Sequence, residues 1–316
     1  MKNWLKVLLL AALTMILAVG CSTKAPGTSE EPATSGEDKE APATDSMKLG
    51  LSVSTLNNPF FVTLKEGAEA EAKKQGIQIT AVDAQNDPAK QISDIEDLIQ
   101  QGVNALIINP TDSAAVVAAI ESANSAGIPV ITVDRSAEGG EVVAHIASDN
   151  VAGGKMAGEF ILETLGSKGK IVELEGIPGS SAARERGEGF HSAVDGVEGV
   201  EVVAKQAADF DRAKGLTVME NILQGNKDIQ AVFAHNDEMA LGALEALAAA
   251  GLNDVLVVGF DATDDAVKAV EDGRMGATVA QKPDLIGQKG VETAISVIKG
   301  ETVEEFIPVE LELIKK

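Results

Sequence analysis

From residue 47 to the end of the chain, short runs rich in Val, Ile and Leu alternate with longer amphipathic runs. The short runs have the length and branched composition of buried strands, whereas the longer runs repeat their apolar residues at helical spacing. One such run places four apolar residues on a single helical face: Ile92, Ile95, Leu98 and Ile99. Because strands and helices alternate, the pattern predicts parallel sheets covered by helices on both faces.

The pattern gives each element an expected range. The strands are expected at 49–54, 77–83, 104–109, 129–133, 142–147, 170–175, 200–206, 229–234, 255–260, 276–281 and 307–314. The helices between them include 59–75, 90–100, 113–126, 151–165, 213–224, 238–250 and 285–299. Several helices end at a glycine, as expected for a left-handed C-terminal residue: Gly76, Gly102, Gly127 and Gly251.

The number of expected strands indicates more than one sheet, because a twisted open sheet of eleven strands is unusual. We therefore predict an α/β protein of two doubly wound, parallel-sheet domains joined by a hinge. The first five strands form one domain and the next five form the other. The last strand, 307–314, is expected to join either sheet.

The N-terminal segment has the features of an export signal. Two lysines precede an apolar run at 7–19. The run is shorter than a transmembrane helix usually requires but fits a secretory signal peptide. The run ends in Leu17-Ala18-Val19-Gly20-Cys21, which resembles a bacterial lipobox except that Ala18 stands where Leu is usual. We expect a signal peptide at 1–21 and lipidation of Cys21. A conventional signal peptide with an incidental cysteine is the alternative.

The segment at 22–46 consists mainly of Ser, Thr, Ala, Pro, Glu and Gly and has no large apolar side chain. Such a segment buries too little apolar surface to offset its ordering entropy, so we expect a disordered tether. The lipid on Cys21 would supply two acyl chains, which is what stable membrane attachment requires.

Charge and composition exclude several classes of function. The net charge of −23 is opposite to what nucleic-acid binding requires and disfavours adhesion to anionic lipid. The three histidines lack metal-ligand spacing, and neither a phosphate-binding loop nor a Gly-x-Ser-x-Gly motif occurs. We expect no catalytic residue, no metal and no cofactor, and therefore no enzyme.

Polar and aromatic residues follow many of the expected strands. In open parallel sheets, ligands bind beyond the carboxyl ends of the strands, so these residues are the candidate site. In the first half they are Asn58, Phe60, Phe61, Asn109, Asp134 and Arg135. In the second half they are Arg186, Phe210, Asn236, Asp261 and Gln281.

These side chains have the chemistry that a sugar requires. Carboxylates accept, guanidinium groups donate, and amides do both, which suits vicinal hydroxyls, while phenyl faces match the apolar C–H face of a sugar ring. The two acids and two arginines sum to zero charge, which favours a neutral polyol. Each residue alone has an ordinary explanation, such as helix capping by Asn58, and only their joint occurrence favours binding.

Several longer stretches resemble the ribose-binding proteins of bacterial uptake systems, in the type I periplasmic-binding-protein superfamily. The resemblance runs from about residue 49 to the C-terminus. It is carried by the stretches at 54–62, 108–113, 145–150, 181–190, 208–212, 236–243 and 258–261.

The resemblance implies D-ribose, in its pyranose form, as ligand. It implies hydrogen bonds from the eight polar candidates and stacking by Phe60, Phe61 and Phe210. It also implies three chain crossings, with one domain at 47–149 plus about 282–310 and the other at 150–281 plus about 311–316. Hinge closure would bury the sugar and present the protein to an ABC-type membrane permease and, in some relatives, to a chemoreceptor. We expect an exported monomer held on the outer face of the cytoplasmic membrane by its lipid alone.

Two alternatives remain within reach of the sequence. The same kind of protein could bind another monosaccharide or a furanosyl signal molecule. A sugar-responsive transcriptional regulator could share the fold, but residues 1–46 do not supply its helix-turn-helix.

Overall fold

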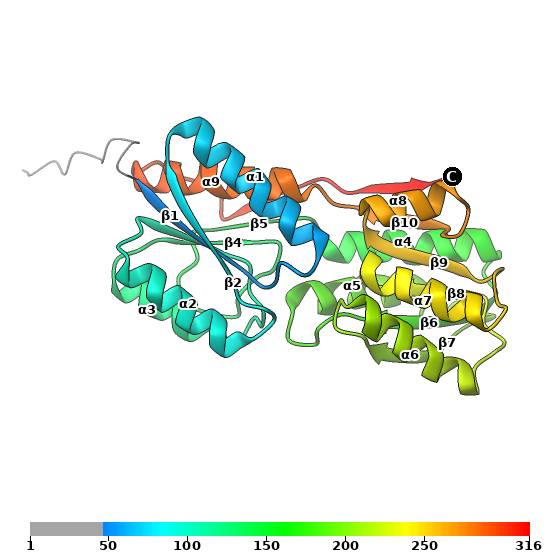
Figure 1. Ribbon diagram of the computed structural model, residues 1–316. Coiled ribbons are helices and arrows are strands. Elements are labelled where there is room, and N and C mark those ends of the chain that lie inside the picture. Colours follow the sequence, from blue (N-terminus) through cyan, green and yellow to red (C-terminus); the bar gives the residue numbers. More distant parts are fainter. Residues whose placement is uncertain (1–46) are drawn as a thin grey trace, which may run out of the picture. The chain divides into compact units, whose positions relative to one another are not determined.

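The computed structural model describes residues 47–316, which form two six-stranded sheets with helices on both faces of each (Figure 1). Their strand orders are β11-β5-β4-β3-β1-β2 and β12-β10-β9-β8-β6-β7. We call the parts built on these sheets the first lobe and the second lobe. The predicted signal peptide, Cys21 and the tether at 22–46 lie outside the described residues.

The first lobe consists of parallel strands throughout. Its strands are β1 (Lys48–Val53), β2 (Gln78–Asp83), β3 (Ala105–Ile108), β4 (Val130–Val133), β5 (Ala144–Ala147) and β11 (Phe306–Pro308). Its helices are α1 (Pro59–Gln75), α2 (Pro88–Gln100), α3 (Val117–Ser125) and α9 (Pro283–Ile298). One apolar core lies under α1 and α9, and another lies under α2 and α3.

The second lobe repeats this plan. Its strands are β6 (Gly169–Glu175), β7 (Val200–Ala207), β8 (Ala231–Ala234), β9 (Leu256–Asp261), β10 (Ala277–Ala280) and β12 (Glu312–Lys315). Its helices are α4 (Asn150–Leu165), α5 (Ser181–Val194), α6 (Arg212–Gly225), α7 (Asp237–Ala249) and α8 (Asp264–Glu271). Helices α4 and α5 cover one core, and α6, α7 and α8 cover the other.

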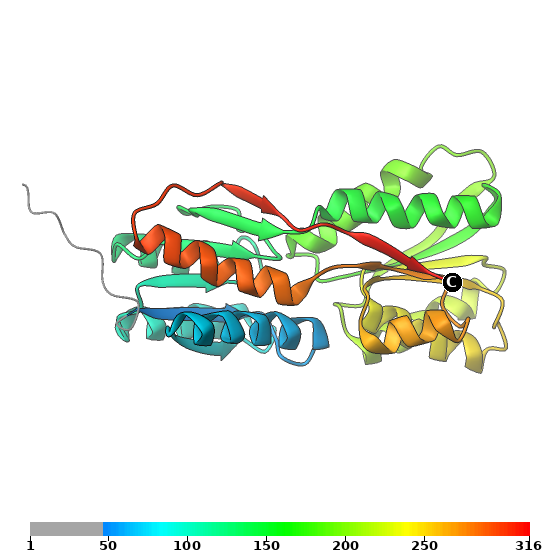
Figure 2. The ribbon, with the colours of Figure 1, turned by 90° about the horizontal axis from the view of Figure 1, so that it is seen from above.

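The predicted fold class is confirmed, and the prediction for the end of the chain is wrong. The run at 307–314 is not one strand but two, β11 in the first sheet and β12 in the second (Figure 2). Strand β11 lies at the edge of the first sheet, where Pro308 is tolerated, and the ladder with β5 ends at the bond from Val309 N to Ala147 O at 3.0 Å. A three-residue link then carries the chain across, and β12 pairs antiparallel with β10.

The chain passes between the lobes three times, after β5, after β10 and after β11. The domain limits expected from the sequence stay predictions, because the contacts among the described residues group both lobes into one compact unit. Within the described part of the chain, none of the helices has both the length and the apolar character needed to cross a bilayer.

Candidate functional site

The carboxyl ends of strands from both sheets meet at a small, buried cavity between the lobes. Of the eleven residues predicted from the sequence, nine line it: Asn58, Phe60, Phe61, Asp134, Arg135, Arg186, Phe210, Asn236 and Asp261. The empty space among these residues, including open solvent at its edge, is about 220 Å³. The structure therefore brings together residues from both halves of the chain, as the pattern of strand ends predicts.

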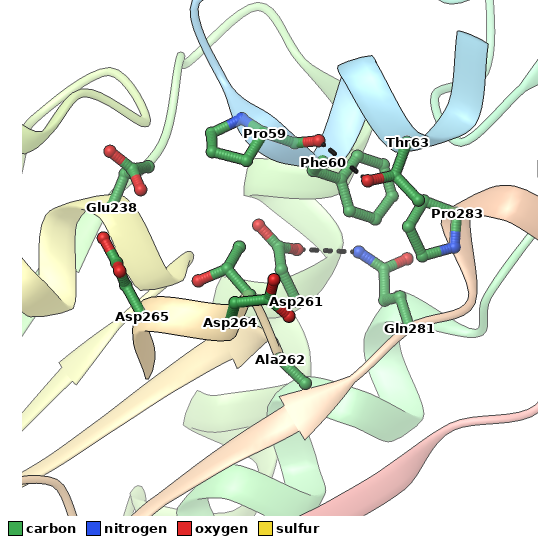
Figure 3. Close-up of a pocket in the computed structure, with 11 residues that line it drawn as sticks. Pro59, Phe60, Thr63, Glu238, Asp261, Ala262, Asp264, Asp265, Gln281 and Pro283 are labelled. Carbon is green, nitrogen blue, oxygen red and sulfur yellow. Dashed lines mark hydrogen bonds between the residues drawn. The ribbon is translucent and has the colours of Figure 1, made fainter. Parts of the chain in front are cut away.

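The two remaining predicted residues do not line this cavity, and Gln281 lines the larger hollow beside it. Asn109 is fully buried and donates from Nδ2 to Asp134 Oδ2 at 3.1 Å. Gln281 donates from Nε2 to Asp261 Oδ1 at 2.9 Å (Figure 3). Each amide thus orients one of the two carboxylates that face the cavity.

Two helices begin at the cavity and explain two of the asparagines. Asn58 caps α1 by accepting from Phe60 N at 2.9 Å, and Asn236 caps α7 by accepting from Met239 N at 3.0 Å. Each asparagine can therefore cap its helix and also line the cavity, because the helix uses only the Oδ1 atom of each side chain.

Four buried charged groups dominate the electrostatics. Asp134 and Arg135 are each 3% exposed, and their closest charged atoms, Oδ2 and Nε, lie 3.7 Å apart. Arg186 NH1 lies 3.7 Å from Asp261 Oδ1 in the second lobe. Each lobe therefore contributes one acid and one guanidinium, and the cavity carries no net charge from these four groups.

Burial shifts the pKa values of Asp134, Arg135 and Asp261 toward their neutral forms. Loss of hydration raises the pKa of the Asp134 carboxyl, against the opposing effect of Arg135. Loss of hydration also raises the pKa of Asp261 to about 7, with Arg186 acting in the other direction. The pKa of Arg135 is lowered to about 10 by the same cause. The charged groups of the site are thus poorly hydrated, and hydrogen bonds made there are stronger than in water.

Phenyl rings pack around the two guanidinium groups. The carbon Cζ of Arg135 lies 5.0 Å from the Phe61 ring centre and 5.1 Å from that of Phe210. Phe60 and Phe61 meet edge to face, with ring centres 5.1 Å apart. All three rings are at most 8% exposed. The rings therefore form apolar walls beside charged groups, the combination expected for a carbohydrate.

Three lining residues adopt positive φ angles, which L-residues rarely do: Asp134 at 62°, Phe210 at 59° and Asp261 at 114°. A strained backbone persists only where the surrounding structure holds it, and such residues cluster at functional sites. The strain here aims a carboxylate or a ring into the cavity directly after a strand.

Some buried polar atoms of the site have no hydrogen-bond partner within the described chain. Asp134 Oδ1 and Arg135 Nε belong to residues that line the cavity, and Gln281 Oε1 belongs to a residue that lines the adjoining hollow. Unpaired buried polar atoms are costly, so a cavity whose lining keeps one acceptor and one donor free favours a ligand rich in hydroxyl groups.

Three contributors were not identified from the sequence. Ala182 lines the cavity, Asn150 Oδ1 accepts from Arg186 Nε at 2.9 Å, and the Phe260 ring centre lies 3.8 Å from Arg186 Cζ. Asn150 carried a usable signal, because it begins α4 directly after the first crossing. Ala182 and Phe260 carried none, since an alanine in a helix and a phenylalanine in a strand are ordinary core residues.

A larger and more open hollow adjoins the cavity and shares Phe60 and Asp261 with it. It has about 880 Å³ of empty space, including open solvent, between the start of α1 and the starts of α7, α8 and α9. Figure 3 shows Pro59, Phe60 and Thr63 facing Asp261, Asp264 and Asp265 across it.

Comparison with known proteins assigns the family. A family model described as a periplasmic binding protein domain matches residues 49–302. The chain belongs to the periplasmic binding protein family. The ribose import binding protein of Bacillus subtilis is 56% identical to this periplasmic binding protein over 313 residues, which is 99% of either chain. That of Escherichia coli is 59% identical over 268 residues, covering 85% of this chain and 90% of the relative.

Solved structures agree with the fold of this periplasmic binding protein. An ABC transporter solute-binding protein from Mycobacterium smegmatis with bound glycerol is 40% identical, with a TM-score of 0.83 over 85% of this chain and 94% of that one. A Caulobacter myo-inositol-binding protein bound to myo-inositol is 36% identical, with a TM-score of 0.82 over 85% and 93% of the two chains.

Proposed function

We propose that this protein binds D-ribose between its lobes outside the cytoplasmic membrane and delivers it to an ABC-type permease. The observation that carries the proposal is the cavity in which two buried carboxylates, two buried guanidinium groups and three phenyl rings converge from both lobes. The relatives named for ribose import, at 56% and 59% identity, support ribose over other sugars. Family membership makes the chain a transport substrate binder rather than an enzyme.

Each lining group has a role in this proposal. Asp134 and Asp261 accept from sugar hydroxyls, while Arg135 and Arg186 donate to hydroxyl and ring oxygens. The amides of Asn58 and Asn236 add one bond each with the side that capping leaves free. Phe60, Phe61 and Phe210 cover the C–H faces of the ring. Asn109 and Gln281 hold the two carboxylates in place, which differs from the direct contact expected from the sequence.

Calorimetry against a panel of neutral sugars tests the proposal. We expect ribose to bind more tightly than arabinose, xylose, glucose, allose or myo-inositol, because misplacing one hydroxyl leaves a buried charged partner unpaired. Ribose binding no tighter than glucose or arabinose would reject the ribose assignment. Tighter binding of another sugar in the panel would keep the transport class and change the ligand, and consumption of a sugar would indicate an enzyme.

We further propose that the protein is anchored by lipid on Cys21. The lipobox-like sequence at 17–21 supports this, and two acyl chains on one residue suffice for stable attachment. The Cys21→Ala variant of the full chain, expressed in a bacterium with lipoprotein processing, is expected to leave the membrane fraction. The parent chain should remain there after a high-salt wash. Equal retention of both chains would overturn the anchor.

A further inference from the structure

A second set of contacts joins the lobes outside the cavity. In the first lobe it comprises Asp112 and Ser113, after β3, and Ser136 and Glu138, after β4. In the second lobe it comprises Gly179, Ser181 and Arg184, around the start of α5. We call this set the clasp. None of its residues lines the cavity.

Three hydrogen bonds cross between the lobes in the clasp. Ser113 N donates to Gly179 O at 2.9 Å, and Ser136 N donates to Ser181 Oγ at 2.9 Å. Arg184 NH2 donates to Glu138 Oε1 at 2.8 Å. The ion pair is roughly half exposed at 45% and 53%, so it contributes less than the other two bonds.

The tightest contact of the clasp lies between Gly179 and Asp112. A Cβ atom added to Gly179 would lie 1.9 Å from Asp112 Oδ2. That carboxylate is not free to turn away, because its Oδ1 accepts from Ala114 N at 3.0 Å and Ala115 N at 2.8 Å. The lobes therefore meet here only because residue 179 has no side chain.

We propose that the clasp sets the affinity for sugar by stabilising the closed arrangement of the lobes without touching the ligand. The inference rests on the proposed function, binding by closure. Every clasp contact joins one lobe to the other, so all of them are lost when the lobes separate. The apparent affinity of a protein that binds in one conformation scales with the population of that conformation. Weakening the clasp therefore weakens binding of every sugar by the same factor.

The Gly179→Ala variant tests the clasp. The added methyl group forces the two lobes apart at this edge. The three atoms nearest to it, at 1.9, 2.8 and 3.5 Å, all belong to Asp112, so no atom of its own lobe is closer than an ordinary contact. We expect ribose to bind about 10-fold or more weakly, mostly through faster dissociation, because release requires opening. The ratio of affinities for ribose and a second sugar of the panel should not change, and neither should the unfolding midpoint of the sugar-free protein.

Two further variants complete the experiment. Gly225→Ala is the matched control, because a Cβ there has no atom within 4 Å, and it should bind as the parent does. Ser181→Ala removes one crossing bond without adding bulk and should weaken binding by a few fold, again equally for all sugars. Dissociation rates by stopped-flow fluorescence of a labelled protein, together with calorimetry, give each quantity.

The possible results separate the clasp from the proposed function. If the parent binds no sugar of the panel, the proposed function fails. If the parent binds ribose and Gly179→Ala binds it equally well, only the clasp is rejected. A Gly179→Ala variant with altered sugar preference or a lowered unfolding midpoint also rejects it, because both would indicate damage to the site or to a lobe.

Discussion

Replacing Asp134 by asparagine is expected to weaken ribose binding by roughly 30- to 100-fold. The carboxylate is buried, keeps Oδ1 free toward the cavity and lies beside Arg135. Hydrogen bonds to charged groups contribute about 1.5–3 kcal/mol, and removing the charge also leaves the two guanidinium groups against a single acid. Asparagine is preferable to alanine here, because Asp134 has φ of 62° and asparagine tolerates that conformation.

Calorimetry on the Asp134→Asn protein measures the loss, and the unfolding midpoint shows whether the fold is retained. Asp254→Asn, at an exposed position of the second lobe, is the matched control and should bind as the parent does. Unlike a weakened clasp, the Asp134 variant should also change the preference among sugars, since it removes a direct contact with one hydroxyl. Unchanged ribose affinity in Asp134→Asn would contradict the proposed role of this carboxylate.

The sequence predicts the layers of this fold well because its central strands are buried on both faces. Strand β3, Ala-Leu-Ile-Ile, is fully buried and reads as an apolar run that needs no periodicity to be recognised. The amphipathic helices are equally clear: Ile95 and Leu98 are buried, and Ile92 and Ile99 pack against the same core. These signals are local, so no knowledge of the partner strands is needed.

The end of the chain shows that local signals predict strands but not the sheet that each strand joins. The run at 307–314 has strand composition throughout, but which sheet a strand joins depends on residues far away in the sequence. Pro308 is compatible with an edge strand, but it does not locate the crossing, because Val309 N still donates to Ala147 O at 3.0 Å. The antiparallel pairing of β12 with β10 follows only from the path of the chain across the lobes.

The candidate site is also predictable only in part from local signals. Residue type and position after a strand predict which residues lie at the cavity, and nine of the eleven candidates line it. They do not predict the hydrogen bonds within the site, such as those from Asn109 to Asp134 and from Gln281 to Asp261. The positive φ angles of Asp134, Phe210 and Asp261 are also invisible in the sequence, because the surrounding fold imposes them.

The Gly189→Ala substitution is expected to lower the free energy of unfolding by about 1–3 kcal/mol, even though alanine favours helices. Helices α4 and α5 pack closely through glycines. A Cβ on Gly189 would lie 1.9 Å from Val151 O, and one on Gly154 would lie 2.0 Å from Arg186 O. Both neighbours are backbone atoms, so the helices themselves must separate. Overpacking of this kind costs about 1–3 kcal/mol or more. This cost outweighs the gain of up to about 1 kcal/mol that alanine brings in helix propensity.

Gly187→Ala, in the same helix two residues earlier, is the control that isolates the cause. A Cβ there would meet its nearest neighbours, Glu173 Oε1 and His235 Cε1, at 3.4 Å, an ordinary contact distance. It should therefore raise the free energy of unfolding by about 0.5–1 kcal/mol through helix propensity alone. Because α5 also carries Arg186, the Gly189 variant should weaken ribose binding while the Gly187 variant does not. Denaturant titrations measure the change in the free energy of unfolding for each variant. If both variants raised it, helix propensity, and not close packing against α4, would decide the stability of α5.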